Sequence, residues 1–297
     1  MAASPLVFTL DESQFDSFLA SFSPFKEDND NPYCVFFGHY KSSSITLYAL
    51  KKGKAKLVIA GSDQDEVATA LGYAEAKKES AYPMPSWGQI GSDEVGTGDF
   101  FGPVIVTSSY VKPSQIKRLK ELGVTDSKLL SDEKILFLGP ILIQEFDYSS
   151  LTLDIIKYNE VHQRNNLNKI KAIMHNQVLL NLKRRHPKAM VCIDQFAPEK
   201  TYYSYLKGEQ EIVTDIVFST KGELAFPSVA LASTIARYSF LRKMKQKEEE
   251  LGLAIPLGAG SKVDEFALKL AKEKGIKALD DLCKKDFKNY RKLIELL

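Results

Sequence analysis

Residues 91–103 read Gly91-Ser-Asp-Glu-Val-Gly-Thr-Gly-Asp-Phe-Phe-Gly-Pro103, and they place two adjacent carboxylates, Asp93 and Glu94, directly before Gly96 and Gly98. Neighbouring residues of a regular strand point to opposite faces, so both carboxylates reach one cation only if the backbone bulges or turns there. The glycines supply that freedom, and they let backbone N–H groups approach a phosphate or a sugar closely. The stretch therefore predicts a metal-assisted phosphate chemistry.

A third carboxylate, Asp194, ends the apolar run Met190-Val-Cys-Ile193. Two separate strand ends are thereby expected to deliver Asp93, Glu94 and Asp194 to one site. Carboxylate oxygens are hard ligands that suit Mg²⁺ or Mn²⁺ and leave coordination positions for water and a phosphate.

Other phosphate and metal sites are disfavoured. The spacing of Gly96, Gly98 and Gly102 misses the dinucleotide-binding pattern G-x-G-x-x-G by one residue, and the GK[ST] of a P-loop is absent. The histidines and cysteines form no zinc pattern, and the cysteines are expected to be ordinary thiols. The residues concerned are His39, His162, His175, His186, Cys34, Cys192 and Cys283.

The 297 residues, 44% of them hydrophobic, favour two domains. No apolar run reaches the length of about 18 residues that a membrane span needs, and the start lacks a secretory pattern. We expect a cytoplasmic protein without membrane contact. Residues 1–85 carry a net charge of −3 and the remainder carries +5, so charge is sorted by region.

Residues 1–85 are expected to form a separate unit. The predicted elements are a helix over 11–21, strands at 33–40, 45–50 and 56–59, and a helix near 65–78. A hairpin turn at Gly53 carries Lys51, Lys52, Lys54 and Lys56 without an intervening acid. These lysines either discourage edge aggregation or grip a phosphate backbone.

The stretch 80–88 contains two prolines and reads as a linker, so the boundary is expected near residue 85. Residues 86–297 follow an α/β pattern that implies a central sheet with helices on its faces. The predicted strands cover 89–95, 102–110, 148–158, 189–194 and 212–219. The predicted helices cover 113–122, 132–146, 167–185 and 228–250.

Several motifs in order carry a family resemblance. They are GSDEVGTGDFFGPVIV, Thr125-Asp-Ser-Lys128, Cys-Ile-Asp194-Gln-Phe and Phe226-Pro-Ser-Val-Ala-Leu-Ala-Ser-Thr-Ile-Ala-Arg237. Together they closely resemble bacterial ribonuclease HIII over about residues 88–297. The front unit resembles that family's amino-terminal domain, which is similar to the TATA-box-binding protein fold.

The resemblance implies a ribonuclease H-like mixed sheet flanked by helices, and an endoribonuclease that cuts the RNA strand of RNA/DNA hybrids. The products would carry 5′-phosphate and 3′-hydroxyl ends. Asp93, Glu94 and Asp194 match the family's metal-binding acids, and two Mg²⁺ or Mn²⁺ ions would activate the water and stabilise the leaving oxygen. Residues 1–85 would raise affinity for the hybrid, and a monomer is expected.

A fourth carboxylate is expected to complete the site. Glu199, at a probable helix start just after Pro198, is the first candidate, with Glu223 in reserve and Asp215 third.

Recognition of the ribose is expected at the glycine turn, where backbone groups of Gly96, Thr97 and Gly98 would read the 2′-OH. Ser127 and Lys128 match a family motif, and Lys128 is a candidate phosphate contact. The related ribonuclease HII has Gly-Arg-Gly where this chain has Gly-Thr-Gly, which predicts weak cutting at single ribonucleotides embedded in DNA.

Two other classes remain open at this stage. One is a non-catalytic hybrid-binding protein, which would need the basic surface but not the acids. The other is a ribonuclease-H-like nuclease that acts on DNA. The sequence also leaves open which cation is used in the cell and whether the role is primer removal or clearance of transcriptional hybrids.

Overall fold

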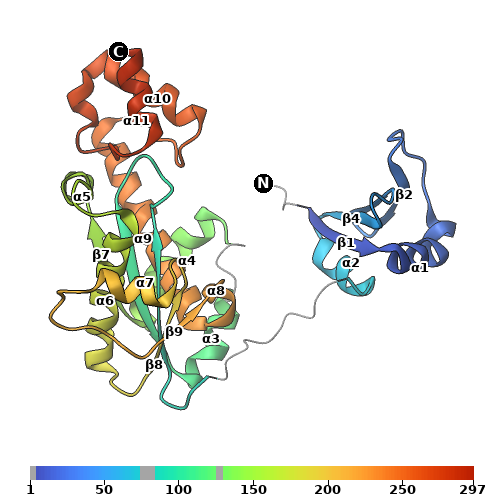
Figure 1. Ribbon diagram of the computed structural model, residues 1–297, viewed down its shortest axis with the longest axis horizontal. Helices are drawn as coiled ribbons and strands as arrows, with labels where there is room; N and C mark the ends of the chain where they lie inside the picture. Colours follow the sequence, from blue (N-terminus) through green and yellow to red (C-terminus); the bar gives the residue numbers. More distant parts are fainter. Residues whose placement is uncertain (1–4, 74–83, 125–129) are drawn as a thin grey trace. The chain divides into compact units, whose positions relative to one another are not determined.

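The computed structural model describes residues 5–73, 84–124 and 130–297. The chain divides into two compact units, residues 1–79 and 80–297, where the linker composition had suggested a boundary near residue 85. Each unit has its own sheet (Figure 1). Each also has its own hydrophobic core. No helix among the described residues is both long enough and apolar enough to cross a membrane.

The first unit is an antiparallel four-stranded sheet in the order β1-β4-β3-β2, with its helices packed on one face. Phe18 of the first helix packs in the same core as Phe36, Leu47 and Leu57 of the sheet. The elements are β1 (Leu6–Asp11), α1 (Glu12–Phe22), η1 (Ser23–Phe25), β2 (Cys34–Tyr40), β3 (Ser43–Tyr48), β4 (Lys54–Gly61) and α2 (Gln64–Ala70).

The predicted hairpin around Gly53 is confirmed. Lys51 and Lys54 form an antiparallel bridge across it, and both residues of the turn have positive φ, 55° for Lys52 and 72° for Gly53. Two left-handed residues make a type I′ turn, whose twist matches that of the strands. Lys51, Lys52, Lys54 and Lys56, called the hairpin lysines below, are all exposed.

Strand β1 was not predicted, although it pairs with β4 along its whole length. The predicted helix near 65–78 is shorter, because α2 ends at Ala70, and residues 74–78 lie outside the described part of the chain.

The second unit contains a mixed five-stranded sheet in the order β7-β6-β5-β8-β9, as the fold prediction required. Strands β5, β6 and β7 are antiparallel neighbours, whereas β8 and β9 continue the sheet from β5 in parallel. The strands are β5 (Gln89–Val95), β6 (Val104–Val111), β7 (Asp147–Leu153), β8 (Met190–Asp194) and β9 (Ile216–Ser219).

Helices cover both faces of this sheet (Figure 1). Helices α4 and α9 pack together on one face, and α6 lies on the other. The approach of α9 is close, because a Cβ on Gly91 of β5 would stand 2.4 Å from the backbone nitrogen of Val229. The helices are η2 (Pro113–Gln115), α3 (Ile116–Leu122), α4 (Asp132–Glu145), α5 (Ile155–His162), α6 (Leu167–Arg185), α7 (Glu199–Tyr205), α8 (Gly222–Ala225), α9 (Pro227–Leu251), α10 (Ser261–Lys274), η4 (Ile276–Leu279) and α11 (Lys288–Leu296).

Two predicted strands are too long. The strand predicted over 148–158 ends at Leu153, because the Asp154 carboxylate accepts a hydrogen bond from the Lys157 N–H at 2.9 Å and starts α5. The strand predicted over 212–219 begins only at Ile216.

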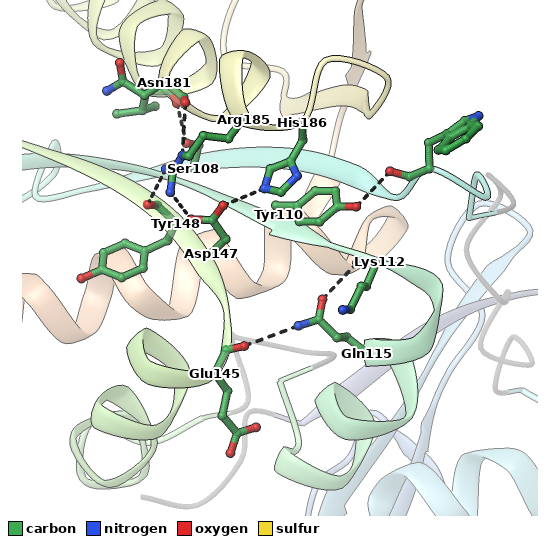
Figure 2. A network of polar contacts seen from close by, with 12 residues as sticks. Ser108, Tyr110, Lys112, Gln115, Glu145, Asp147, Tyr148, Asn181, Arg185 and His186 are labelled. Atoms are coloured by element: carbon green, nitrogen blue, oxygen red, sulfur yellow. Dashed lines mark hydrogen bonds and ion pairs between the residues drawn. The ribbon is translucent and has the colours of Figure 1, made fainter.

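A polar network fastens the edge strand β7 to the end of α6 (Figure 2). Asp147 contacts Nε2 of His186 at 2.6 Å and also pairs with Arg185, which donates to the Tyr148 carbonyl at 3.0 Å. The His186 ring stacks on Tyr110 with centroids 3.6 Å apart. Tyr110 pairs with Ile90 near the start of β5, so this network lies at the end of the sheet away from Asp93.

Candidate active site

The predicted acids stand at the ends of two adjacent parallel strands. Ser92 of β5 pairs with Ile193 of β8, so Asp93 and Asp194 follow at the same level on strands about 4.8 Å apart. Gly91 faces α9 and Ser92 contacts His175 of α6. Because side chains alternate along a strand, Asp93 and Asp194 lie on the α9 face of the sheet and Glu94 lies on the α6 face.

Of the bulge or turn expected near Asp93 and Glu94, the structure has the turn and not the bulge. Strand β5 pairs with β6 in unbroken register from Gln89 to Val95. The chain turns only after the strand, at Gly96, whose φ is 86° and whose added Cβ would meet the Pro103 carbonyl oxygen at 2.1 Å. The two acids therefore flank the strand end from opposite faces.

Two other carboxylates, Glu94 and Asp194, lie near Asp93. Burial and the neighbouring charges of Glu94 and Asp194 raise the pKa of Asp93 to about 7, against the lowering effect of a hydrogen bond with the Ser233 side chain. The Asp93 carboxylate also accepts the N–H of Glu94 at 2.8 Å. Three carboxylates from two strands thus influence one another.

Glu94 is held by two basic side chains of α6. His175 Nε2 lies 2.9 Å from one carboxylate oxygen, and Lys171 forms an ion pair with the other. Burial raises the pKa of Glu94, but the bond with His175 and the charge of Lys171 outweigh it, so the pKa is lowered. Nδ1 of His175 lies 2.8 Å from the hydroxyl of Ser92, and the Lys171 ammonium sits 4.0 Å from the ring centroid of Phe196.

Asp194 is oriented by the start of α8. Its carboxylate accepts the N–H of Gly222 at 2.7 Å, and a Cβ on Gly222 would lie 3.0 Å from the Asp194 Cα. The next residue, Glu223, is 5% exposed. The short helix therefore brings a fourth carboxylate next to the end of β8.

The other candidates lie in different surroundings. Glu199 is exposed in the first turn of α7, and the Asp215 side chain is 77% exposed near Lys183. Ser127 and Lys128 lie outside the described residues.

The glycine turn becomes more open along its length. Gly96 is buried, Thr97 is half-buried, and Gly98 is exposed, with no other atom within 4 Å of an added Cβ.

Lys171, His175 and Ser233 contact the acids, and none of the three is among the site residues predicted from the sequence. A signal was present for the first two, because Lys171 and His175 fall at helical spacing in line with Leu182 on the buried stripe of a correctly predicted helix. A lysine and a histidine in such a stripe need a polar partner.

The residues fit a hard divalent cation by their chemistry. As the side chains stand, no three of His, Cys, Asp and Glu among the described residues are grouped closely enough to hold a metal ion. Glu94 is turned toward α6 and Asp194 toward Gly222. The donors are nevertheless all oxygen, and a dication would stabilise the ionised form of Asp93, whose pKa is raised first by burial and then by the charges of Glu94 and Asp194. The three cysteines are free, as predicted.

A ribonuclease-H-like sheet with acids at the ends of its central strands defines a class of metal-dependent nucleases, and comparison with known proteins specifies the family. The model of the family described as Ribonuclease HII matches residues 90–290. Ribonuclease HIII of Lactococcus lactis subsp. lactis (strain IL1403) is 34% identical over 98% of both chains. Ribonuclease HIII of Bacillus velezensis is 40% identical over 86% of this chain and 87% of its own length.

A solved structure agrees over the same extent. The crystal structure of Bst-RNase HIII in complex with Mn²⁺ has a TM-score of 0.70 and 31% identity, and the match covers 99% of each chain. The chain belongs to the ribonuclease HII/HIII family, the metal-dependent endoribonucleases that cleave the RNA of RNA/DNA hybrids.

Proposed function

We propose that this chain hydrolyses the RNA strand of RNA/DNA hybrids with Mg²⁺ or Mn²⁺ held by Asp93, Glu94 and Asp194, leaving 5′-phosphate and 3′-hydroxyl ends. The observation that carries the proposal is the placement of these acids at the ends of the adjacent parallel strands β5 and β8. Two bound cations would supply activation of the attacking water and stabilisation of the leaving oxygen.

The surrounding side chains prepare the acids for this task. Lys171 and His175 keep Glu94 ionised and fix both of its oxygens on the α6 side. The N–H of Gly222 orients Asp194. Held in this way, Asp194 loses little conformational freedom when a cation binds, whereas Glu94 would have to turn at least one oxygen away from α6 to join it.

Glu223 is the better candidate for the fourth carboxylate. It follows Gly222, whose N–H bonds Asp194, and its side chain is buried, whereas Glu199 is exposed. We propose that Glu223 acts there as the fourth acid, next to Asp194. Glu199 in solvent has no described contact with the other three acids.

The glycine turn is proposed to read the ribose. Backbone groups of Gly96, Thr97 and Gly98 lie just beyond Glu94, and the space around Gly98 is open to a ligand. Thr97 lacks the guanidinium of the ribonuclease HII motif, so long RNA runs are the proposed substrate. Lys128 and Ser127 are proposed to contact the phosphate backbone.

Residues 1–85 are proposed to bind the hybrid, and residues 86–297 to cleave it. The hairpin lysines project from an exposed turn and strand. Four cations without an acid between them attract a phosphate backbone without reading its sequence.

The test is cleavage of an end-labelled RNA/DNA hybrid beside all-DNA and all-RNA duplexes, with each cation in turn. Hybrid cleavage that disappears in Asp93→Asn supports the proposal. Binding without cleavage would indicate a non-catalytic hybrid-binding protein. Cleavage of the DNA duplex would indicate a DNA nuclease.

A further inference from the structure

The segment that follows the glycine turn is fastened to the last part of the chain. The Asp99 carboxylate accepts the N–H of Gly258 at 2.7 Å, and the N–H of Phe100 donates to the Gly258 carbonyl at 2.9 Å. The N–H of Gly102 donates to the carbonyl of Leu282 at 3.1 Å. Loops between the carboxyl-terminal helices therefore hold residues 99–102 through backbone hydrogen bonds.

Lys284 makes the central contact in this attachment. Its side chain is fully buried, and its ammonium donates to the carbonyls of Asp99 at 2.7 Å and Gly102 at 2.5 Å. Its own N–H donates to the Phe100 carbonyl at 2.9 Å. One residue thus bonds three carbonyls within four positions of the segment.

Burying an ammonium group carries a large desolvation cost in free energy, even when the group donates to carbonyls. Burial lowers the pKa of Lys284 to about 8, although the charges of Asp99 and Asp286 act in the opposite direction. No carboxylate among the described residues forms an ion pair with it. An apolar side chain of similar length would fill the same space without a charge, so fixing the segment is the distinctive effect of this lysine.

The segment that Lys284 holds directly follows Gly96, Thr97 and Gly98, whose backbone groups are proposed to bind the ribose. Across the described residues, nothing accepts a hydrogen bond from the N–H groups of Gly96, Thr97 or Gly98. Gly96 and Gly102, at the two ends of the loop, have φ values of 86° and 85°. The carbonyls of residues 99, 100 and 102 are thus held by Lys284, while the amides of residues 96–98 are available to a ligand.

We propose that Lys284 is a positioning residue that fixes the loop 96–102, so that the free amides of the glycine turn meet the substrate ribose in one orientation. This inference rests on the proposed hybrid cleavage. Lys284 has no described contact with Asp93, Glu94 or Asp194. Its removal is therefore expected to weaken substrate binding and to leave the chemical step largely intact. An interaction made equally in ground state and transition state changes KM and not kcat.

The experiment compares steady-state cleavage of a hybrid at fixed Mn²⁺ by the wild-type protein, Lys284→Met and Leu293→Ala. Leu293 lies in the hydrophobic cluster that contains Phe100 and Phe101 of the loop, and it is 2% exposed. It has no described hydrogen bond to the loop. For Lys284→Met we expect a KM at least about tenfold higher, equivalent to about 1.4 kcal/mol, with kcat changed by less than about threefold. Leu293→Ala lowers the melting temperature and leaves KM unchanged.

An unchanged KM in folded Lys284→Met, or the same rise of KM in Leu293→Ala, would overturn the proposal. If Lys284→Met does not fold, Lys284→Gln decides, because it keeps one neutral donor and should raise KM by a smaller factor. An unchanged KM in Lys284→Gln then rejects the role. A wild-type protein that fails to cleave the hybrid would contradict the proposed function instead.

Discussion

The buried pair between Lys171 and Glu94 gives a prediction whose size follows from its surroundings. The two side chains are 9% and 14% exposed, and the ammonium also lies over the ring of Phe196. Lys171→Met keeps most of the side-chain volume and removes the charge. Glu94 is then left with His175 as its basic partner.

Removal of one partner from a buried ion pair costs about 3–5 kcal/mol. A loss of that size lowers the melting temperature of a domain of this length by roughly 6–20 °C. The pKa of Glu94 is lowered in the folded protein, so its stabilising contribution is present above the unfolded pKa and is lost as the pH falls through the folded value. The difference between wild type and variant is therefore full at pH 7.5 and smaller at pH 4.

Thermal unfolding followed by circular dichroism, without divalent ions, measures the effect at both pH values. The matched control is Arg184→Met, also on α6. It removes an ion pair with Glu211 in which the two side chains are 56% and 61% exposed. Exposed pairs contribute about 0–1 kcal/mol. Equal losses in the two variants, or a Lys171→Met deficit that is the same at pH 4 and pH 7.5, would refute the reasoning.

Three further outcomes are expected. Gly91→Ala should cost about 1–3 kcal/mol in denaturant unfolding, because its Cβ would lie 2.4 Å from the Val229 nitrogen, whereas an effect below about 0.5 kcal/mol would show that α9 can shift. Glu223→Gln should reduce kcat on a hybrid far more than Glu199→Gln, and the reverse order would restore Glu199 as the fourth carboxylate. Replacing the hairpin lysines by alanine should weaken hybrid binding and flatten its dependence on salt, and an unchanged slope would assign them to solubility.

Sequence periodicity located most of the catalytic unit. The predictions for β5 and α6 match the structure from Gln89 to Val95 and from Leu167 to Arg185, because a buried strand and a long amphipathic helix have clear patterns. The predicted strand extended past Leu153 because β-branched residues continue into α5. In the structure the side chain of Asp154 caps the start of α5 and so ends the strand. The helices after residue 251 were not predicted at all.

The acids were predictable and their setting was not. Asp93, Glu94 and Asp194 are predictable as acids at strand ends, but the pattern of β5 alone does not show which side chains face each acid. In the sheet, opposite faces meet different helices, with Ser233 on one side and Lys171 on the other. Those contacts join residues far apart in the chain, which a local pattern cannot report.

The parallel pairing of β5 with β8 also sets an order of events during synthesis. Asp93 and Asp194 are 101 positions apart, and at about 5–20 residues per second a ribosome needs roughly 5–20 s to pass from one to the other. During this interval β5 has only its antiparallel neighbour β6, and the acid cluster lacks Asp194. The growing polypeptide consequently cannot assemble this acid cluster until Asp194 has been synthesised.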